Sequence, residues 1–460
     1  MAKSSRSGED RHPVLLGKKK KSAVSLSRKK PRKYQKKAFK RFKDERSAFL
    51  AMEMRLGKSL VAIRLVEKWK AERILVLAPK TVLLAWEDEL DEEGHKYLNL
   101  SSHTLKEREF LLEHATAYPF MLLNYESVQK LEGIIEDWRP DCIICDESTK
   151  IKNARAGVTR TLLRMCDNVE RKICLSGLPT PRSWKDVYSQ CAFLGDGYFM
   201  GRGNYWNWEK DNTTTGFHKH DKFFSPKQQA RVKAAFHGRA YVLTRSQAGI
   251  KDNKVRTRRG IELSPRDRKY YDYVEKYWEA PNPEEYTAKH AMCVQTYLRQ
   301  WVAKRKMGEL SNILDDIGDT ESVVVWCAFN SDMDGIAETF RGRGILARKL
   351  NGETPDRNRK RYLAEFQAGK TRAIIVQMAL GQFGIRLDRA SIAIYYTTSY
   401  NFEERAQSED RVVDVEKDEP LLIFDITTKD TIEEAVHENL QEKKTDAKYL
   451  MARIRAKRAQ

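Results

Sequence analysis

Two separate stretches of this chain alternate short apolar runs with helical patterns, and this repeated alternation limits the possible folds more than any other feature. Short buried strands that alternate with helices form mainly parallel sheets covered on both faces. Each stretch therefore predicts one α/β lobe. The apolar runs of the first stretch are Phe49–Met52, Ile74–Ala78, Met121–Leu123, Cys142–Cys145 and Ile173–Leu175.

The second α/β stretch begins near Ser322, after a region whose pattern is mainly helical. Its predicted strands are Val323–Ala328, Ala373–Gln377, Ile392–Tyr396 and Leu421–Ile426, and its predicted helices are Pro355–Phe366 and Phe402–Val412. We expect a disordered basic arm at 1–30, a first lobe at 31–195, a mainly helical insertion at 196–320, a second lobe at 321–430 and a C-terminal helix at 431–460.

The charge balance of the chain indicates a polyanionic partner. Its 460 residues include 85 Lys and Arg against 65 Asp and Glu, a formal net charge of +20. Such an excess predicts attraction to nucleic acid, although a soluble basic protein with a charged tail has the same composition. No apolar run approaches the ~18 residues that span a bilayer, so we expect no membrane association. Seven scattered cysteines are typical of reduced thiols and predict a cytoplasmic protein.

The string MRLGKS at 54–59 lies between a predicted strand and a predicted helix, the context that a phosphate-binding loop requires. Backbone N–H groups at a helix N-terminus attract anionic oxygens, so Arg55, Leu56 and Gly57 are expected around a nucleotide. Lys58 is expected to reach the β- and γ-phosphates and Ser59 to hold Mg²⁺. Met52 stands where the general pattern has a glycine, and an ordinary loop is the alternative.

The string DEST at 146–149 strengthens the prediction of a nucleotide site. Asp146 and Glu147 directly follow a predicted strand, at the edge where open α/β sheets bind ligands. Asp146 is expected to complete the Mg²⁺ shell, and Glu147 to orient or deprotonate the attacking water. The alternative is a solvated acidic turn.

Nearby cysteine and histidine residues do not predict a metal site. Cys142 and Cys145 are three apart on a strand and therefore face opposite sides of the sheet. No second pair lies close in the sequence to complete a zinc site. His218 and His220, in a run rich in glycine and aromatic residues, are expected at the surface.

Taken in order, these strings resemble the Swi/Snf-like branch of superfamily-two helicases and translocases over about 30–428. The resemblance includes PRKYQ at 31–35, LAPKTVLLAW at 77–86, LLNYES at 122–127 and LSGLPT at 175–180. It implies two RecA-like lobes, with Gln35 reading the adenine of ATP. It also implies nucleic-acid contacts by Lys80, Thr81, Asn124 and Tyr125, and a coupling role for Ser176 and Thr180.

The second lobe carries the resemblance further through LNGETPDRNR at 350–359, LGQFGIRL at 380–387 and QSEDR at 407–411. Gly384, Arg386 and Gln407 are implied at the nucleotide, and Arg411 is implied to reach the γ-phosphate across the cleft. The family usually has a second arginine where this chain has Asp414. Our hypothesis is that Arg411 suffices, with help from Arg386, and that Asp414 points away.

The sequence thus predicts a monomeric DNA-dependent ATPase that uses ATP and Mg²⁺ to move along DNA, with duplex favoured by the resemblance. It resembles a compact phage or bacterial enzyme, in a bacterial cytoplasm or an infected host cell. Strand separation stays open, and so do two rivals, a nucleotide-gated DNA-binding protein with little hydrolysis and an RNA helicase. Protein partners are not indicated.

Overall fold

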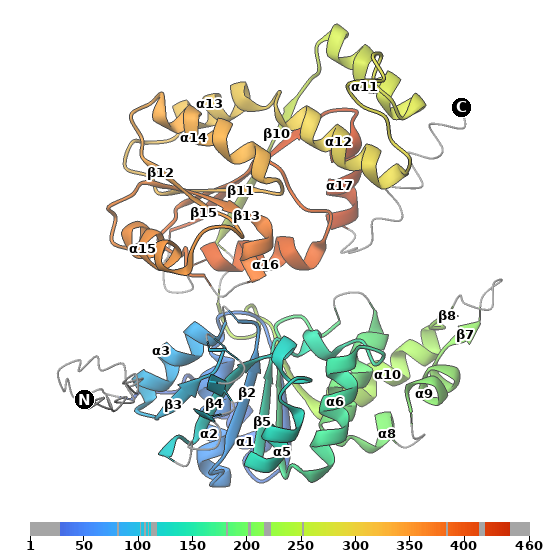
Figure 1. The fold of residues 1–460 in the computed structure, drawn as a ribbon, viewed down its shortest axis with the longest axis vertical. Helices are drawn as coiled ribbons and strands as arrows, with labels where there is room; N and C mark the ends of the chain where they lie inside the picture. The colour runs from blue at the N-terminus through green and yellow to red at the C-terminus, as the bar shows by residue number, and fades with distance from the viewer. Residues whose placement is uncertain are drawn as a thin grey trace, which may run out of the picture.

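The computed structural model consists of two α/β lobes, one above the other in Figure 1. None of the helices in the described part of the chain has the length and apolar composition needed to cross a membrane. The described residues are 28–80, 82–101, 103–104, 107–108, 110–111, 117–180, 183–200, 204–215, 222–250, 253–382, 385–413 and 419–441.

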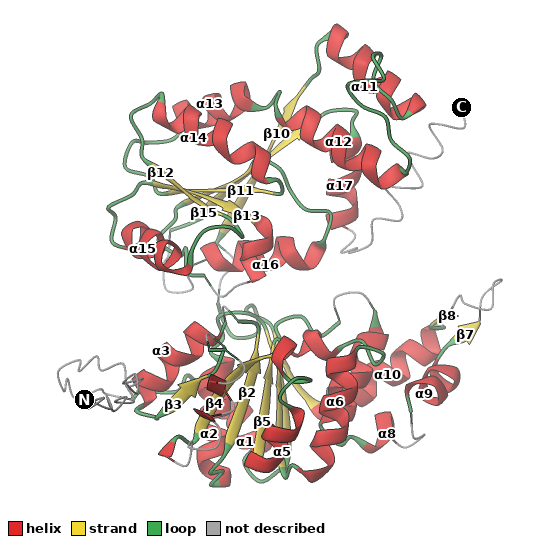
Figure 2. Ribbon diagram, viewed as in Figure 1, coloured by secondary structure: helices red, strands yellow, loops and turns green. Residues whose placement is uncertain are grey.

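The first lobe is built on a seven-stranded parallel sheet in the order β3-β4-β2-β5-β6-β1-β9. All five strands predicted for this lobe are present, which confirms the α/β prediction. Their carboxyl ends face the second lobe in Figure 2, so the loops that follow them meet there. The strands are β1 (Ser47–Met52), β2 (Ile74–Ala78), β3 (Tyr97–Asn99), β4 (Phe120–Asn124), β5 (Cys142–Asp146), β6 (Arg171–Leu175) and β9 (Ala240–Leu243).

Alternate residues of these strands fill two cores, one on each face of the sheet. Phe49 and Cys145 belong to one core, and Leu50 and Cys142 belong to the other. The two cysteines therefore lie on opposite faces, as expected from their spacing. One face is covered by α1 (Lys33–Phe42), α2 (Lys58–Trp69) and α3 (Leu83–Glu93); the other is covered by α5 (Glu132–Trp138), α6 (Gly157–Met165), α7 (Val187–Phe193), α8 (Gly197–Met200), α9 (Tyr205–Asn212) and α10 (Pro226–Arg239).

The second lobe has a six-stranded parallel sheet in the order β10-β15-β14-β11-β13-β12. Its four predicted strands and both predicted helices are present within one or two residues of the expected bounds. The strands are β10 (Lys254–Ile261), β11 (Val323–Cys327), β12 (Ala347–Leu350), β13 (Ala373–Gln377), β14 (Ile392–Tyr395) and β15 (Leu421–Thr428). The covering helices are α13 (Met307–Asp316), α14 (Met333–Arg341), α15 (Asp356–Gln367) and α16 (Phe402–Val412).

The region expected as a separate helical insertion, 196–320, is instead divided between the lobes. Strand β9 extends the first sheet beside β1, and β10 forms the edge of the second sheet beside β15. The remaining hairpin joins β7 (Thr214–Thr215) to β8 (Lys222–Phe223). Helices α11 (Pro265–Tyr277), α12 (Ala291–Ala303) and α17 (Ile432–Gln441) share a further core on the second lobe. His218 and His220 lie outside the described residues.

A buried ion pair holds α13 and α17 to the second sheet. Lys306 is 1% exposed, and its ammonium donates hydrogen bonds to Glu433, to the carbonyl of Tyr396 (2.9 Å) and to that of Ile426 (2.9 Å). The other oxygen of Glu433 accepts from the N–H of Thr428 at 2.9 Å. Burial lowers the pKa of Lys306, and the Glu433 carboxylate opposes that shift.

Replacing Lys306 with Met should lower the free energy of unfolding by about 3–5 kcal/mol, because Glu433 would remain buried without its cation. Denaturant unfolding followed by tryptophan fluorescence measures this loss. Lys349→Ala is the control, since its pair with Asp334 is exposed and should contribute at most about 1 kcal/mol. Lys306→Met combined with Glu433→Leu should recover much of the loss, and no recovery would contradict the explanation.

Candidate functional site

The phosphate-binding loop predicted from MRLGKS connects β1 to α2. Arg55 and Gly57 both have left-handed backbone angles, with φ of 64° and 69°. The loop curls around the ammonium of Lys58, which donates to the carbonyls of Met52 (3.0 Å) and Glu53 (3.4 Å). The first N–H groups of α2 have no partner within the helix, so this terminus is suited to an anion.

Gln35 fastens α1 to this loop. Its amide nitrogen donates to the carbonyls of Leu56 (3.1 Å) and Gly57 (3.4 Å), and its amide oxygen accepts from the N–H of Arg32 (2.7 Å). A Cβ atom at Gly57 would lie 2.3 Å from the Gln35 amide nitrogen, so Gln35 would have to shift, and the left-handed backbone angle itself favours glycine. A cavity of about 380 Å³ adjoins Gln35 and is lined by Pro31, Gln35, Lys36, Phe39, Leu60, Val61, Arg64, Glu67 and Lys68.

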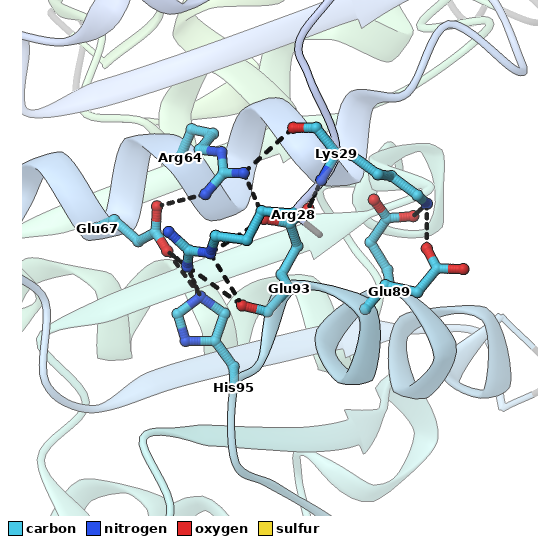
Figure 3. A network of polar contacts seen from close by, with 8 residues as sticks. Arg28, Lys29, Arg64, Glu67, Glu89, Glu93 and His95 are labelled. Carbon is cyan, nitrogen blue, oxygen red and sulfur yellow. Dashed lines mark hydrogen bonds and ion pairs between the residues drawn. The ribbon is translucent and has the colours of Figure 1, made fainter. Parts of the chain in front are cut away.

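A polar network anchors the chain just before α1, as Figure 3 shows. Arg28 donates to Glu67 on α2 and to the carbonyl of Glu93 (3.2 Å). Arg64, one turn before Glu67 on the same helix, pairs with Glu93 at 2.5 Å. Although burial opposes the shift, hydrogen bonds from Arg64 and Arg28 lower the pKa of Glu67. The last residues of the expected arm are thus bound to the helix that begins at Lys58.

Asp146 and Glu147 lie at the end of β5, facing the phosphate loop. The Asp146 carboxylate accepts from the indole N–H of Trp86 and from the N–H of Glu147, each at 2.8 Å. The Tyr125 hydroxyl donates to the Asp146 carbonyl, also at 2.8 Å. Burial raises the pKa of Asp146, and burial together with the neighbouring Asp146 raises that of Glu147. Glu147 is itself left-handed, with φ of 49°.

Arg411 on α16 brings the second lobe to these carboxylates. Its Nε donates to the carbonyl of Gly381 at 2.8 Å. Burial lowers its pKa, and the negative charge of Glu147 is the largest opposing influence. The charges of Lys58 and Arg411 both act on Asp146 and Glu147. The structure therefore brings together the four side chains that the sequence analysis expected to be catalytic.

The segment LSGLPT packs directly against the phosphate loop. Ser176 is fully buried, and its hydroxyl accepts from the N–H of Leu178 at 3.2 Å. A Cβ atom at Gly177 would lie 3.0 Å from the Met54 Cγ and 3.4 Å from its backbone nitrogen. Thr180 lies half-buried at the end of this segment. The coupling role of Ser176 and Thr180 stays a prediction.

Three residues with clear structural roles were missed by the sequence analysis. The buried amide of Gln190 donates to the carbonyl of Pro179 (2.9 Å) and accepts from the hydroxyl of Ser148 (2.6 Å), so it links LSGLPT to DEST. Trp86 and Gly177 lie inside motifs already identified, which was the available signal. Gln190 lies in no such motif, and no sequence pattern indicated it.

The remaining predicted nucleotide residues differ in their surroundings. Ser59 is half-buried in the first turn of α2, and Gln407 is buried, with the oxygen of its amide making no hydrogen bond among the described residues. Arg386 is different, because its side chain is 79% exposed and pairs with Asp388 at 3.2 Å. The Arg386 guanidinium therefore points to Asp388 in this structure. The predicted assistance of Arg386 to Arg411 stays a prediction. Gly384 and Asp414 lie outside the described residues.

The residues expected to contact nucleic acid also differ in exposure and in hydrogen bonding. Lys80 is exposed just after β2, as a phosphate contact requires, and the half-buried Asn124 makes a 2.8 Å hydrogen bond to Glu126. Tyr125 is 3% exposed and its hydroxyl donates to the Asp146 carbonyl, and its expected contact with nucleic acid stays a prediction. Thr81 lies outside the described residues.

The donor set fits Mg²⁺ held mainly by nucleotide phosphates. The candidate protein donors are the Ser59 hydroxyl and the Asp146 carboxylate, both oxygen ligands of the kind that this hard cation prefers. Among the described residues, no three His, Cys, Asp or Glu side chains group as a metal site of their own. Mg²⁺ usually takes only one or two carboxylates besides phosphates, so this arrangement is sufficient.

Comparison with known proteins identifies the family. A model of the SNF2-related domain matches residues 18–306, and one of the helicase conserved C-terminal domain matches residues 305–416. The chain therefore belongs to the SNF2-related family, whose members are ATP-dependent enzymes of the helicase class. This confirms the resemblance inferred from the motifs.

Individual relatives are distant. An uncharacterized ATP-dependent helicase of Mycoplasma pneumoniae is 22% identical over 412 residues, which are 84% of this chain and 38% of that protein. The chain spans about two fifths of the length of the mycoplasma relatives. Putative protein p41 of Acyrthosiphon pisum secondary endosymbiont phage 1 is 24% identical, with 93% of this chain and 99% of that protein covered. The Sulfolobus solfataricus SWI2/SNF2 ATPase core in complex with dsDNA has a TM-score of 0.44 at 20% identity, covering 94% of this chain and 95% of that one.

Gly177→Ala should weaken ATP binding and turnover, because the added methyl group displaces Met54 and with it the phosphate loop. Met54 would have to give by a few tenths of an ångström, and a displacement of that size at such a site should cost up to about 10-fold in rate. Steady-state ATPase kinetics and nucleotide titration measure both effects. Gly133→Ala is the matched control, since a Cβ atom there meets nothing within 4 Å. Equal behaviour of the two variants would contradict the proposed contact.

Proposed function

We propose that this protein is a DNA-dependent ATPase that moves along DNA, with duplex as the favoured track. The observation that carries the proposal is the convergence of Lys58 and Arg411, from separate lobes, on Asp146 and Glu147. A site whose charges come from both lobes makes hydrolysis depend on how the lobes meet.

Each side chain then has a distinct role. The N–H groups of the phosphate loop and the Lys58 ammonium hold the β- and γ-phosphates. Ser59 and Asp146 would hold Mg²⁺, which neutralises phosphate charge when bound. Glu147 orients the attacking water and accepts its proton, for which its raised pKa is favourable. Arg411 stabilises the charge that develops on the transferred phosphoryl group.

The proposed track is a phosphate backbone, held without reading its sequence. Support comes from the net charge of +20, from the exposed Lys80 at the carboxyl edge of the first sheet, and from family membership. Backbone contacts release counterions, so binding should weaken steeply as salt rises. Translocation in place of strand separation is part of the proposal, as is action as a monomer in a bacterial cytoplasm or an infected host cell.

Glu147→Gln should reduce DNA-stimulated ATP hydrolysis by about 10²–10⁴-fold, because an amide cannot accept the proton of the attacking water. Arg411→Ala should lose about 10³-fold or more. Phosphate release with duplex DNA, single-stranded DNA and RNA measures both variants and identifies the track.

The exposed substitution Lys349→Ala serves as the control and should leave turnover unchanged. Wild-type protein that binds DNA tightly without DNA-stimulated turnover would replace the motor with the nucleotide-gated binding protein. Stimulation by RNA alone would replace it with the RNA helicase.

A further inference from the structure

Arg55 of the phosphate loop donates hydrogen bonds to the second lobe. Its Nε donates to the carbonyl of Asp410 at 2.7 Å, its Nη1 to the Asp388 carboxylate at 2.8 Å, and its Nη2 to the carbonyl of Arg411 at 2.9 Å. The Nη2 of Arg55 therefore holds the backbone of Arg411, the residue that the second lobe contributes to the proposed catalytic site. The contacts bridge the two lobes, and the three partners lie more than 330 positions away in the sequence.

Two features indicate that the side chain at this position has a specific task. Arg55 adopts a left-handed backbone, with φ of 64°, where a non-glycine residue is strained. The Arg55 side chain is 18% exposed and the Asp388 side chain 9%, so the ion pair between them is largely shielded from water. Strain that persists in a folded chain requires compensating interactions, and the three hydrogen bonds of Arg55 supply them.

We propose that Arg55 is a positioning residue, which fixes the backbone of Arg411 so that its guanidinium meets the transferred phosphate. This inference rests on the proposed function, since it assigns Arg411 to hydrolysis. Arg55 was expected at the nucleotide, and its hydrogen bonds in the structure run to Asp388 and to two carbonyls of α16. A guanidinium can reach three acceptors in fixed directions, whereas an ammonium cannot reproduce that fork.

Arg55→Gly removes the side chain without backbone strain and should lower kcat for DNA-stimulated hydrolysis by about 10- to 100-fold. The affinity for ADP should stay within threefold of wild type, because the loop N–H groups and Lys58 remain. Arg55→Lys should recover only part of the rate. Asp388→Ala should cause a similar loss, and the double variant should lose no more than the more damaging single one, as residues acting through one contact do.

Lys152→Ala is the matched control for general cohesion between the lobes. Lys152 pairs with Glu403 across the same interface at 3.2 Å and does not contact Arg411. The kcat of the Lys152→Ala variant should stay within threefold of wild type. An equal loss in Lys152→Ala, an unchanged kcat in Arg55→Gly, or a rise in the Kd for ADP that matches the fall in kcat would each overturn the assignment. Wild-type protein without any turnover would sink the proposed function, whereas those three outcomes sink only this inference.

Discussion

The structure depends on the balance of charge around two neighbouring carboxylates, the buried Asp146 and the half-buried Glu147. Asp146 and Glu147 lie side by side at the end of one strand, where burial makes their charged forms costly. Lys58 from the same lobe and Arg411 from the other lower that cost. Lys58 has the larger effect on both pKa values and Arg411 adds to it from the second lobe, so part of the charge balance at the site depends on the contact between the lobes.

Two of the six left-handed non-glycine residues in the described part of the chain lie where this chemistry is expected. Several left-handed residues outside the site, such as Lys70, Arg139 and Trp278, end helices, where this conformation is ordinary. Arg55 and Glu147 have no such explanation, and both follow strands that lead into the cleft. The tight loops after β1 and β5 direct the polar groups of Arg55 and Glu147 towards the second lobe. The packed sheet beneath these loops holds their backbone conformation.

Central strands and catalytic motifs were predictable from the sequence because each is a local pattern. Ile74–Ala78 and Ala373–Gln377 are continuous apolar runs and were predicted with their observed bounds. By contrast, β10 and β12 contain several Arg and Lys residues, since both lie at sheet edges and need no apolar pattern. Contacts such as Gln190 with Ser148, or Arg55 with Asp388, join distant segments and leave no local signature.

The contact of Arg55 with the second lobe changes what the phosphate loop does. With glycine at this position the loop would have no side chain to reach α16. Here the loop holds the backbone carbonyls of Asp410 and Arg411 directly, so separating the lobes must break three hydrogen bonds made by one side chain. Because the same loop curls around Lys58, the position of Arg411 and the shape of the phosphate site become mechanically connected. In the proposed mechanism, closure of the lobes would therefore also assemble the catalytic charges.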